Sequence, residues 1–356
     1  MLPERPDLTK LDPKTRAYIE ALEAQLARQQ PAARSERKAR PALTQDDEDL
    51  FMSSEPLEPS EPPTTINLFI ATASGLVRRT PRHLFNRQRR GGMGAIEFET
   101  PTGEPPSIMA LADERQNLLL LTSLGRAHRL PISLVPESDG RNASSMVTRL
   151  NLAEGETIAA ILPEQAQGYL ASVSQSGMVR MLRHHVFGEY MKPGMPLYDY
   201  KTFGPLAAAC WTPGDGDLFI ATRQGRAIRF SEKLVPPQGG PGIRLTDDDS
   251  VVGIAPVHSG SSVFLLSDDG RGTLRQMEGF APNKAPGAGG KFAISTSRLV
   301  CALGTEDVED VFIITGSGKL IRFPCTEIPP KDGVVQGVVC LSLRADHPVA
   351  AVLSTR

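Results

Sequence analysis

The sequence contains little of several residue types, and each scarcity excludes a class of protein. Only four of its 356 residues are cysteines, and no two of them form a C-x-x-C pair, which argues against a zinc site and against a secreted disulfide framework. The longest leucine run, residues 118–121, is far too short to cross a bilayer, and the N-terminus has no apolar signal segment. We therefore expect a soluble cytoplasmic protein with no membrane partner, whose cysteines are free thiols in the core.

Neither sign of charge dominates the chain, which has 39 basic and 41 acidic residues, but the acidic charge gathers near the N-terminus. Residues 1–63 carry 9 basic and 13 acidic side chains, and the remainder carries 30 and 28. Residues 30–65 are rich in Pro, Ser and acidic residues and poor in apolar ones, which predicts a disordered linker. Its acidic cluster Asp46–Asp49 either competes with nucleic acid for the basic body or serves only as a solvating spacer.

Residues 1–29 contain one helix signal. Asp12 and Pro13 supply an N-cap and a first helical residue, and Ile19, Leu22 and Leu26 follow at three- and four-residue spacing. The apolar stripe is too short for a stable coiled coil. The helix expected over residues 13–29 therefore either docks on the rest of the chain or self-associates weakly.

From residue 66 onward the sequence repeats six times. Apolar runs end in a Thr/Ser-x-x-Gly turn, and an apolar residue follows ten positions after each turn glycine. The repeat glycines are Gly75, Gly125, Gly177, Gly225, Gly270 and Gly318, and the apolar residues are Phe85, Val135, Phe187, Val235, Phe280 and Ile328. A unit of 45 to 52 residues with several short strand signals has the size of one four-stranded blade in a radial β-architecture. Residues 66–356 are thus predicted to form one all-β, six-bladed domain.

In five units another apolar run precedes the repeat glycine by 15 to 19 residues, as Ile158–Leu162 does. The first unit has prolines there instead, which cannot form a regular ladder. The chain ends on a similar run, Pro348–Leu353. We therefore expect this terminal run to pair with the first blade and to close the ring.

Basic residues follow each repeat glycine. The six ten-residue windows after these glycines hold 14 basic and 3 acidic side chains; the basic ones are Arg78, Arg79, Arg82, Arg126, Arg129, Arg180, Arg183, Arg226, Arg229, Lys233, Arg271, Arg275, Lys319 and Arg322. Equivalent positions of a radial repeat occupy equivalent parts of the surface, which predicts a ring-shaped basic track. Aromatic residues are scarce in these windows, which favours duplex backbone contacts over stacking on single strands. The alternative is that these residues pair with acidic neighbours within the fold.

Two clusters have some of the residue types of metal sites. His184 and His185 have only Glu189 as a nearby carboxylate, and Asp247–Asp249 lack the glycine positions of a calcium loop. These patterns are more typical of surface histidines and of a charged turn. No metal or other cofactor is predicted.

The densest positive charge lies in the first unit, where residues 62–96 carry six arginines and no acidic residue. This stretch ends in Gln88-Arg89-Arg90-Gly91-Gly92-Met93-Gly94. Guanidinium groups beside flexible glycines suit the binding of phosphates. With the six repeats, this motif resembles the gyrase-A box, Q-R-R-G-G-K-G, of the C-terminal domain of DNA gyrase A, a six-bladed β-pinwheel. Met93 departs from the family's lysine.

The resemblance implies a protein that binds and wraps duplex DNA, with Gln88, Arg89, Arg90, Gly91, Gly92 and Gly94 inheriting the role of the box. It also implies gyrase or topoisomerase IV subunits as partners and the bacterial nucleoid as the setting. Nothing before residue 66 has room for the cleavage domain of gyrase, and the tyrosines lie on the short helix and inside the repeats. A stand-alone pinwheel without enzymatic activity is therefore expected. A protein-interaction scaffold that has lost strong DNA binding is the alternative, favoured by Met93 and by the small net charge.

Overall fold

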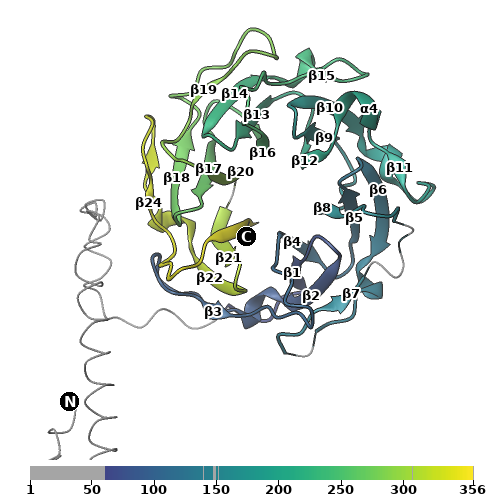
Figure 1. Cartoon of the computed structure of the whole chain (residues 1–356), viewed down its shortest axis with the longest axis vertical. Coiled ribbons are helices and arrows are strands. Elements are labelled where there is room, and N and C mark those ends of the chain that lie inside the picture. The colour runs from purple at the N-terminus through teal and green to yellow at the C-terminus, as the bar shows by residue number, and fades with distance from the viewer. Residues whose placement is uncertain (1–60, 139, 147–149, 151, 307, 356) are drawn as a thin grey trace, which may run out of the picture. The chain divides into compact units, whose positions relative to one another are not determined.

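The computed structural model describes residues 61–356 except 139, 147–149, 151, 307 and 356, and it shows six β-sheets arranged in a ring (Figure 1). The predicted all-β, six-bladed architecture is confirmed. The helix expected over residues 13–29 and the acidic cluster Asp46–Asp49 lie outside the described residues. No helix among the residues described is long and apolar enough to span a membrane.

Each blade contains a long antiparallel hairpin, an inner strand toward the ring axis and a short outer strand. In the order inner strand, hairpin and outer strand, blade 1 is β4 (Ile108–Asp113), β1 (Ile66–Ala71), β2 (Leu76–Pro81) and β7 (Ser144–Ser145); blade 2 is β8 (Ile158–Pro163), β5 (Asn117–Thr122), β6 (Arg126–Pro131) and β11 (Met195–Pro196); blade 3 is β12 (Leu206–Thr212), β9 (Tyr169–Ser174), β10 (Met178–Arg183) and β15 (Gly240–Pro241). Blade 4 is β16 (Val251–Val257), β13 (Asp217–Thr222), β14 (Arg226–Ser231) and β19 (Lys291–Phe292); blade 5 is β20 (Leu299–Gly304), β17 (Ser262–Ser267), β18 (Arg271–Gln276) and β23 (Pro330–Lys331), with β24 (Val338–Val339) also on β18; blade 6 is β25 (Pro348–Thr355), β21 (Val308–Thr315), β22 (Lys319–Pro324) and β3 (Ala95–Ile96).

Neighbouring repeats exchange strands. The inner strand that follows each hairpin in sequence pairs back onto that hairpin, as β4 does on β1. The outer strand comes from beyond the next hairpin, as β7 does for β2. No blade is therefore made from one sequence repeat alone, and every blade depends on its neighbour.

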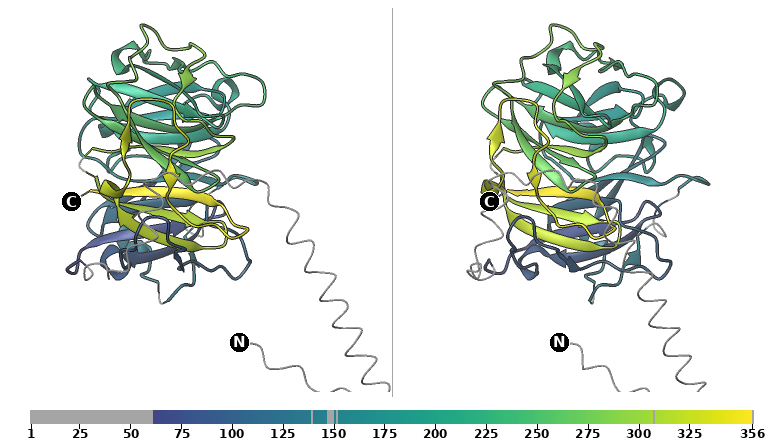
Figure 2. Two further views of the ribbon diagram at one scale, coloured as in Figure 1. Left: turned by 90° about the vertical axis from the view of Figure 1, so that its left-hand side faces the viewer. Right: turned by 60° about the vertical axis from the view of Figure 1, so that its left-hand side comes forward.

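The expected position of the terminal strand was wrong. Strand β25 pairs with β21 of the sixth hairpin and not with the first blade. The reason is the strand exchange, because each inner strand pairs with the hairpin that precedes it in sequence. The last hairpin therefore takes its inner strand from the end of the chain, whereas the first hairpin already has β4. The ring is closed instead by β3, which the first repeat contributes to β22, with Lys319 opposite Ile96. Figure 2 shows β25 lying beside the first blade, against which it packs without pairing.

The hydrophobic cores lie between the blades. Alternate residues of a strand face opposite sides, so Leu118 and Leu120 pack toward blade 1 while Leu119 and Leu121 pack toward blade 3. The seam between blades 6 and 1 buries Phe312 and Ile314 against Leu68 and Ile70. Because both faces of the first hairpin strand are covered, these strands read as continuous apolar runs.

Short turns follow most hairpins. They are the 3₁₀ helices η2 (Arg82–Leu84), η3 (Ile132–Leu134), η5 (His184–Phe187), η6 (Glu232–Leu234) and η7 (Cys325–Glu327), and a short α-helical turn, α4 (Tyr200–Phe203), lies in the third repeat. The apolar residue ten positions after each repeat glycine closes this turn and is buried in five repeats and half-buried at Val235. The four cysteines are free thiols, and Cys325 and Cys340 are buried.

Residues 61–65, which the sequence assigns to the linker, contact the propeller. The backbone N–H of Thr64 donates to His83 Nδ1 at 3.2 Å, and Thr65 Oγ1 donates to Asp113 Oδ2 at 2.5 Å. Glu61 forms ion pairs with Arg82 and Arg322. Among the described residues, contacts with the propeller therefore already occur five residues before the predicted boundary.

Candidate nucleic-acid interface

Basic residues of the second hairpin strand recur most often at two positions, which have different surroundings. The fourth residue after the repeat glycine is Arg79, Arg129, Arg229 or Arg322, and the first is Arg126, Arg226, Arg271 or Lys319. The arginine at the fourth position reaches the next blade in three of these repeats, whereas Arg129 pairs with Glu164 at 3.0 Å; the first position lies beside the short outer strand.

Three arginines at the fourth position clamp neighbouring blades together. In each case Nη1 donates to the two carbonyl groups that flank the turn after the next hairpin. Arg79 reaches Ile132 O and Val135 O at 3.2 and 2.9 Å, and Arg229 reaches Met277 O and Phe280 O at 2.8 and 3.2 Å. Arg322 makes the same contacts across the closing seam, with Arg82 O and Phe85 O at 3.2 and 3.0 Å.

A polar residue on the preceding strand orients each clamp. The Nε groups of Arg79, Arg229 and Arg322 donate to Asn67, Asp217 and Asp310 at 3.1, 2.7 and 2.8 Å, respectively. Arg229 and Arg322 are 3% and 2% exposed. Both guanidinium groups are committed to the protein, so we leave them and Arg79 out of the DNA-binding surface that we propose. These arginines fit the alternative given above, in which basic residues pair with neighbours inside the fold.

Several other predicted contact residues also point into the protein. Arg78 pairs with Glu97 at 2.9 Å, and Arg82 pairs with Glu61 at 2.8 Å. Arg90 is 4% exposed and donates to Val339 O at 2.8 Å. Arg275, also 4% exposed, donates to Gly279 O at 3.1 Å. Their positions are structural in this fold, so they too are left out of the proposed surface.

Other predicted contact residues reach the surface. Apart from the clamp residue Arg79, the predicted cations that are half-exposed or exposed include Arg89, Arg126, Arg129, Arg180, Arg183, Arg226 and Lys319. Arg126 stands opposite Pro196 of β11, Arg226 opposite Phe292 of β19, and Lys319 opposite Ile96 of β3. Residues at this first position thus recur at the same place beside the outer strand in blades 2, 4 and 6.

The Gln88–Gly94 box lies against blades 5 and 6, where the first repeat crosses the end of the ring. The N–H of Gln88 donates to Arg322 O at 2.7 Å, and the N–H of Gly91 donates to Cys340 O at 2.9 Å. Gly94 has φ +67°, and a Cβ there would lie 2.8 Å from Leu320 O, so glycine is required for this close approach. Arg89 is half-exposed and Met93 is 53% exposed. The box therefore presents these two side chains while Arg90 anchors it.

Arg126 and Arg180 also share a surface hollow between blades 2 and 3. This cavity of about 550 Å³ is lined in addition by Tyr198, Tyr200 and the carboxylate of Asp199. Arg180 Nη1 donates to Leu197 O at 3.0 Å. The hollow is wide enough for a phosphate group beside two guanidinium groups.

Glu156 neutralises part of the charge of Arg126. Arg126 Nε lies 2.8 Å from Glu156 Oε1, and Thr122 Oγ1 also donates to this carboxylate. Burial opposes ionisation of Glu156, but the hydrogen bonds from Arg126, Thr122 and the N–H of Ala153 outweigh it and lower the pKa to about 2. Glu156 was not predicted from the sequence.

This lowered pKa predicts an acid-sensitive contribution to stability. Because the folded-state pKa lies below the ordinary value of 4.5, Glu156 stabilises the fold above that pH, and its contribution is lost as the pH falls toward 2. Glu156→Gln should lower the Tm at pH 7 and remove this part of the pH dependence in thermal melts. Glu154→Gln, the same charge change at an exposed neighbour, should do neither. Identical melts of Glu156→Gln and wild type at pH 7 would contradict this role.

Among the described residues, no group of three His, Cys, Asp or Glu side chains is placed to hold a metal ion. Asp249 accepts hydrogen bonds from the N–H groups of Gln224 and Ser250 at 3.1 and 2.9 Å, so it caps a hairpin turn. The rings of His184 and His185 contact each other edge to face.

A propeller whose adjacent blades exchange strands, with a glycine-rich basic loop at its closing seam, is a β-pinwheel. The family described as DNA gyrase C-terminal domain, beta-propeller, matches residues 67–95, 116–163, 216–258 and 309–356. The solved DNA gyrase A C-terminal domain superimposes with a TM-score of 0.68 at 17% identity, over 81% of this chain and 99% of that chain. The C-terminal domain of DNA topoisomerase IV gives a TM-score of 0.57 at 18% identity, over 83% and 94%.

Full-length gyrase A proteins match in sequence. The DNA gyrase A protein of Staphylococcus epidermidis is 27% identical over 291 residues, covering 78% of this chain and 33% of the relative. That of Haloquadratum walsbyi is 26% identical over 302 residues, covering 80% and 35%. The chain spans about a third of the length of these relatives. The resemblance of the repeat domain to the DNA gyrase A C-terminal domain is thereby confirmed.

Proposed function

We propose that this protein binds duplex DNA around the outer edge of its propeller and bends it without catalysing a reaction. The observation that carries the proposal is the recurrence of surface cations at one position beside the outer strands, at Arg126, Arg226 and Lys319, together with Arg89 on the box. Cations repeated around a ring favour contact with a polyanion that follows the same curve.

The box gives this track a starting point. Lys319 lies opposite Ile96, which follows the box by two residues, so Lys319 and Arg89 both lie at the closing seam. DNA that enters here and continues past Arg226 and the hollow at Arg126 would curve around the ring. The likeness to gyrase and topoisomerase IV domains supports a role in DNA topology, either as an architectural factor of the bacterial nucleoid or beside the subunits of such an enzyme.

A scaffold that binds protein instead is the second candidate. Met93, Ile96 and Phe292 are 53%, 40% and 51% exposed on the same edge, and apolar side chains contribute nothing to phosphate binding. DNA binding at low salt separates the two candidates, because a scaffold of this kind would not bind duplex.

Replacing Arg89 with alanine tests the role of the box. If Arg89 holds one phosphate, the slope of log K against log salt should shrink by about 0.9. Supercoil trapping in relaxed plasmid should fall more than affinity, because the other cations still attract duplex. Mobility shifts at several salt concentrations and a topology assay measure the two effects.

Arg115→Ala serves as the control, since it removes an exposed arginine from the turn between β4 and β5, away from the outer strands. It should leave the slope and the trapping unchanged. A full salt slope and full trapping in Arg89→Ala would remove the box from the interface. No duplex binding by the wild type at low salt would overturn DNA binding altogether.

A further inference from the structure

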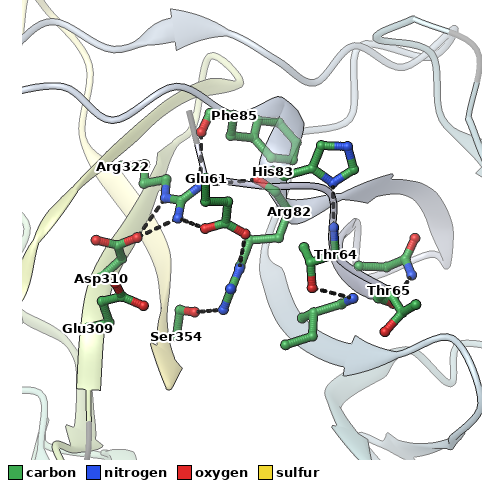
Figure 3. Close-up of polar contacts among 12 residues, drawn as sticks. Glu61, Thr64, Thr65, Arg82, His83, Phe85, Glu309, Asp310, Arg322 and Ser354 are labelled. Atoms are coloured by element: carbon green, nitrogen blue, oxygen red, sulfur yellow. Dashed lines mark hydrogen bonds and ion pairs between the residues drawn. The ribbon is translucent and has the colours of Figure 1, made fainter. Parts of the chain in front are cut away.

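Glu61 joins the two ends of the ring. Its Oε1 lies 2.8 Å from Arg82 Nε in the first repeat, and its other oxygen pairs with Arg322 Nη2 in the last hairpin (Figure 3). Arg82 in turn donates to Ser354 Oγ and, at 3.0 Å, to Thr355 O of the C-terminal strand. One carboxylate from the segment before the propeller therefore connects the first repeat, the last hairpin and, through Arg82, the chain end.

The charges at this seam balance only when Glu61 is in place. Arg82, Arg322 and Arg87 face Glu61, Asp310 and Glu309. Arg82 and Arg322 are 7% and 2% exposed, so water replaces little of a lost partner. Burial opposes ionisation of Glu61, but the hydrogen bonds from Arg322 and Arg82 outweigh it and hold the pKa of this carboxyl below its ordinary value.

Arg322, one of the two arginines that pair with Glu61, also contacts the box. Arg322 O accepts the hydrogen bond from the N–H of Gln88, the first residue of the box, at 2.7 Å. Arg322 Nη1 also holds the carbonyls of Arg82 and Phe85, which precede the box by a few residues. Arg87, immediately before the box, pairs with Glu309 at 2.7 Å and with Asp310 at 3.0 Å. The approach to the box is thus fixed by one ion-pair network.

We propose that Glu61 is a positioning residue for the DNA-binding box: by fixing Arg322 and Arg82 from the segment before the propeller, it sets the path of Gln88–Gly94 across the seam. Whatever precedes residue 61 is thereby coupled to the box, because a pull on this segment removes the carboxylate from both arginines. The structural part stands by itself, and its consequence for wrapping rests on the proposed function.

Glu61→Gln in the full chain tests the proposal. It keeps the size of the side chain but leaves the buried guanidinium groups with one negative charge fewer. We expect the amide hydrogen of Gln88 to exchange about tenfold faster as the seam opens locally, while Gly177, whose N–H bonds Ser174 O in blade 3, exchanges as in wild type. Supercoil trapping should fall while affinity for linear duplex is retained.

Glu104→Gln is the matched control. It removes the same charge at a half-exposed carboxylate of the first repeat, which accepts from the N–H of Ser74 at 3.0 Å, away from the seam. It should change neither readout. Unchanged exchange of Gln88 in Glu61→Gln would overturn the proposal, whatever the DNA assays show. Faster exchange with unchanged trapping would refute the link between the seam and DNA wrapping. A wild type that traps no supercoils would instead reject the proposed function. In that case the exchange of Gln88 still tests whether Glu61 holds the seam.

Discussion

Replacing Arg229 with alanine should destabilise the propeller by about 3 kcal/mol or more and lower its Tm by roughly 6–12 °C. The side chain is 3% exposed, pairs with Asp217 at 2.7 Å and donates to two carbonyls of the next repeat. Its removal leaves a partly buried carboxylate and two carbonyl groups without their donor, which costs more than the net value of the contacts. Lysine should not rescue the loss, because a single ammonium cannot reproduce the planar fork of donors.

Arg226→Ala is the matched control for this effect. Arg226 lies three residues earlier on the same strand, is half-exposed and donates to Gly290 O at only 3.4 Å. Its loss should change the Tm little and shrink the salt slope of duplex binding by about 0.9. Thermal melts and salt titrations of the two variants should therefore separate the stabilising arginine from the one in the proposed interface. Equal Tm changes in the two variants would show that the clamp adds no stability.

The clamp leaves a signal in the sequence that charge counting alone does not reveal. The residue eight positions before the repeat glycine is Asn67, Asn117, Asp217 or Asp310 in the four repeats that have arginine four positions after it. In the third and fifth repeats, the residue eight positions before the glycine is Tyr169 or Ser262. The residue four positions after it is Met181 or Leu274. The two positions are diagonal neighbours across the hairpin, and they change together across the repeats. Comparison of the repeats could therefore have pointed to the structural role of Arg79, Arg229 and Arg322, although Arg129 shares the pattern and pairs with Glu164 instead.

Other features could not be predicted from one repeat. The turn glycines and apolar runs report local strand and turn formation, so the six blades follow from them. Which strand pairs with which hairpin depends on contacts between repeats, and this is why β25 was assigned to the wrong blade. Glu61 looks like one more acidic residue of a polar segment. Its role follows only from Arg82 and Arg322, which are 21 and 261 residues away in sequence.

Ring closure by the first repeat should depend on Gly318. Gly318 has φ +81°, and a Cβ there would lie 2.1 Å from Phe98 O. Its carbonyl accepts hydrogen bonds from the N–H groups of Glu97 and Phe98 at 2.9 and 3.2 Å. We expect Gly318→Ala to push this return segment away, to weaken the pairing of β3 with β22 and to destabilise the domain by about 2–4 kcal/mol.

Gly103→Ala separates closure from backbone strain. Gly103 has φ +72° with nothing within 4 Å of its Cβ position, so alanine there should cost only about 1 kcal/mol. The difference between the two variants in thermal melts, and faster amide exchange at Ile96 in Gly318→Ala alone, measure the closure.

Because the Gln88–Gly94 box ends immediately before β3, an opened seam leaves the cations of the box on the surface but no longer fixes where DNA turns. Gly318→Ala should therefore bind linear duplex yet trap few supercoils, and equal melting and trapping in the two glycine variants would show that β3 does not hold the ring closed.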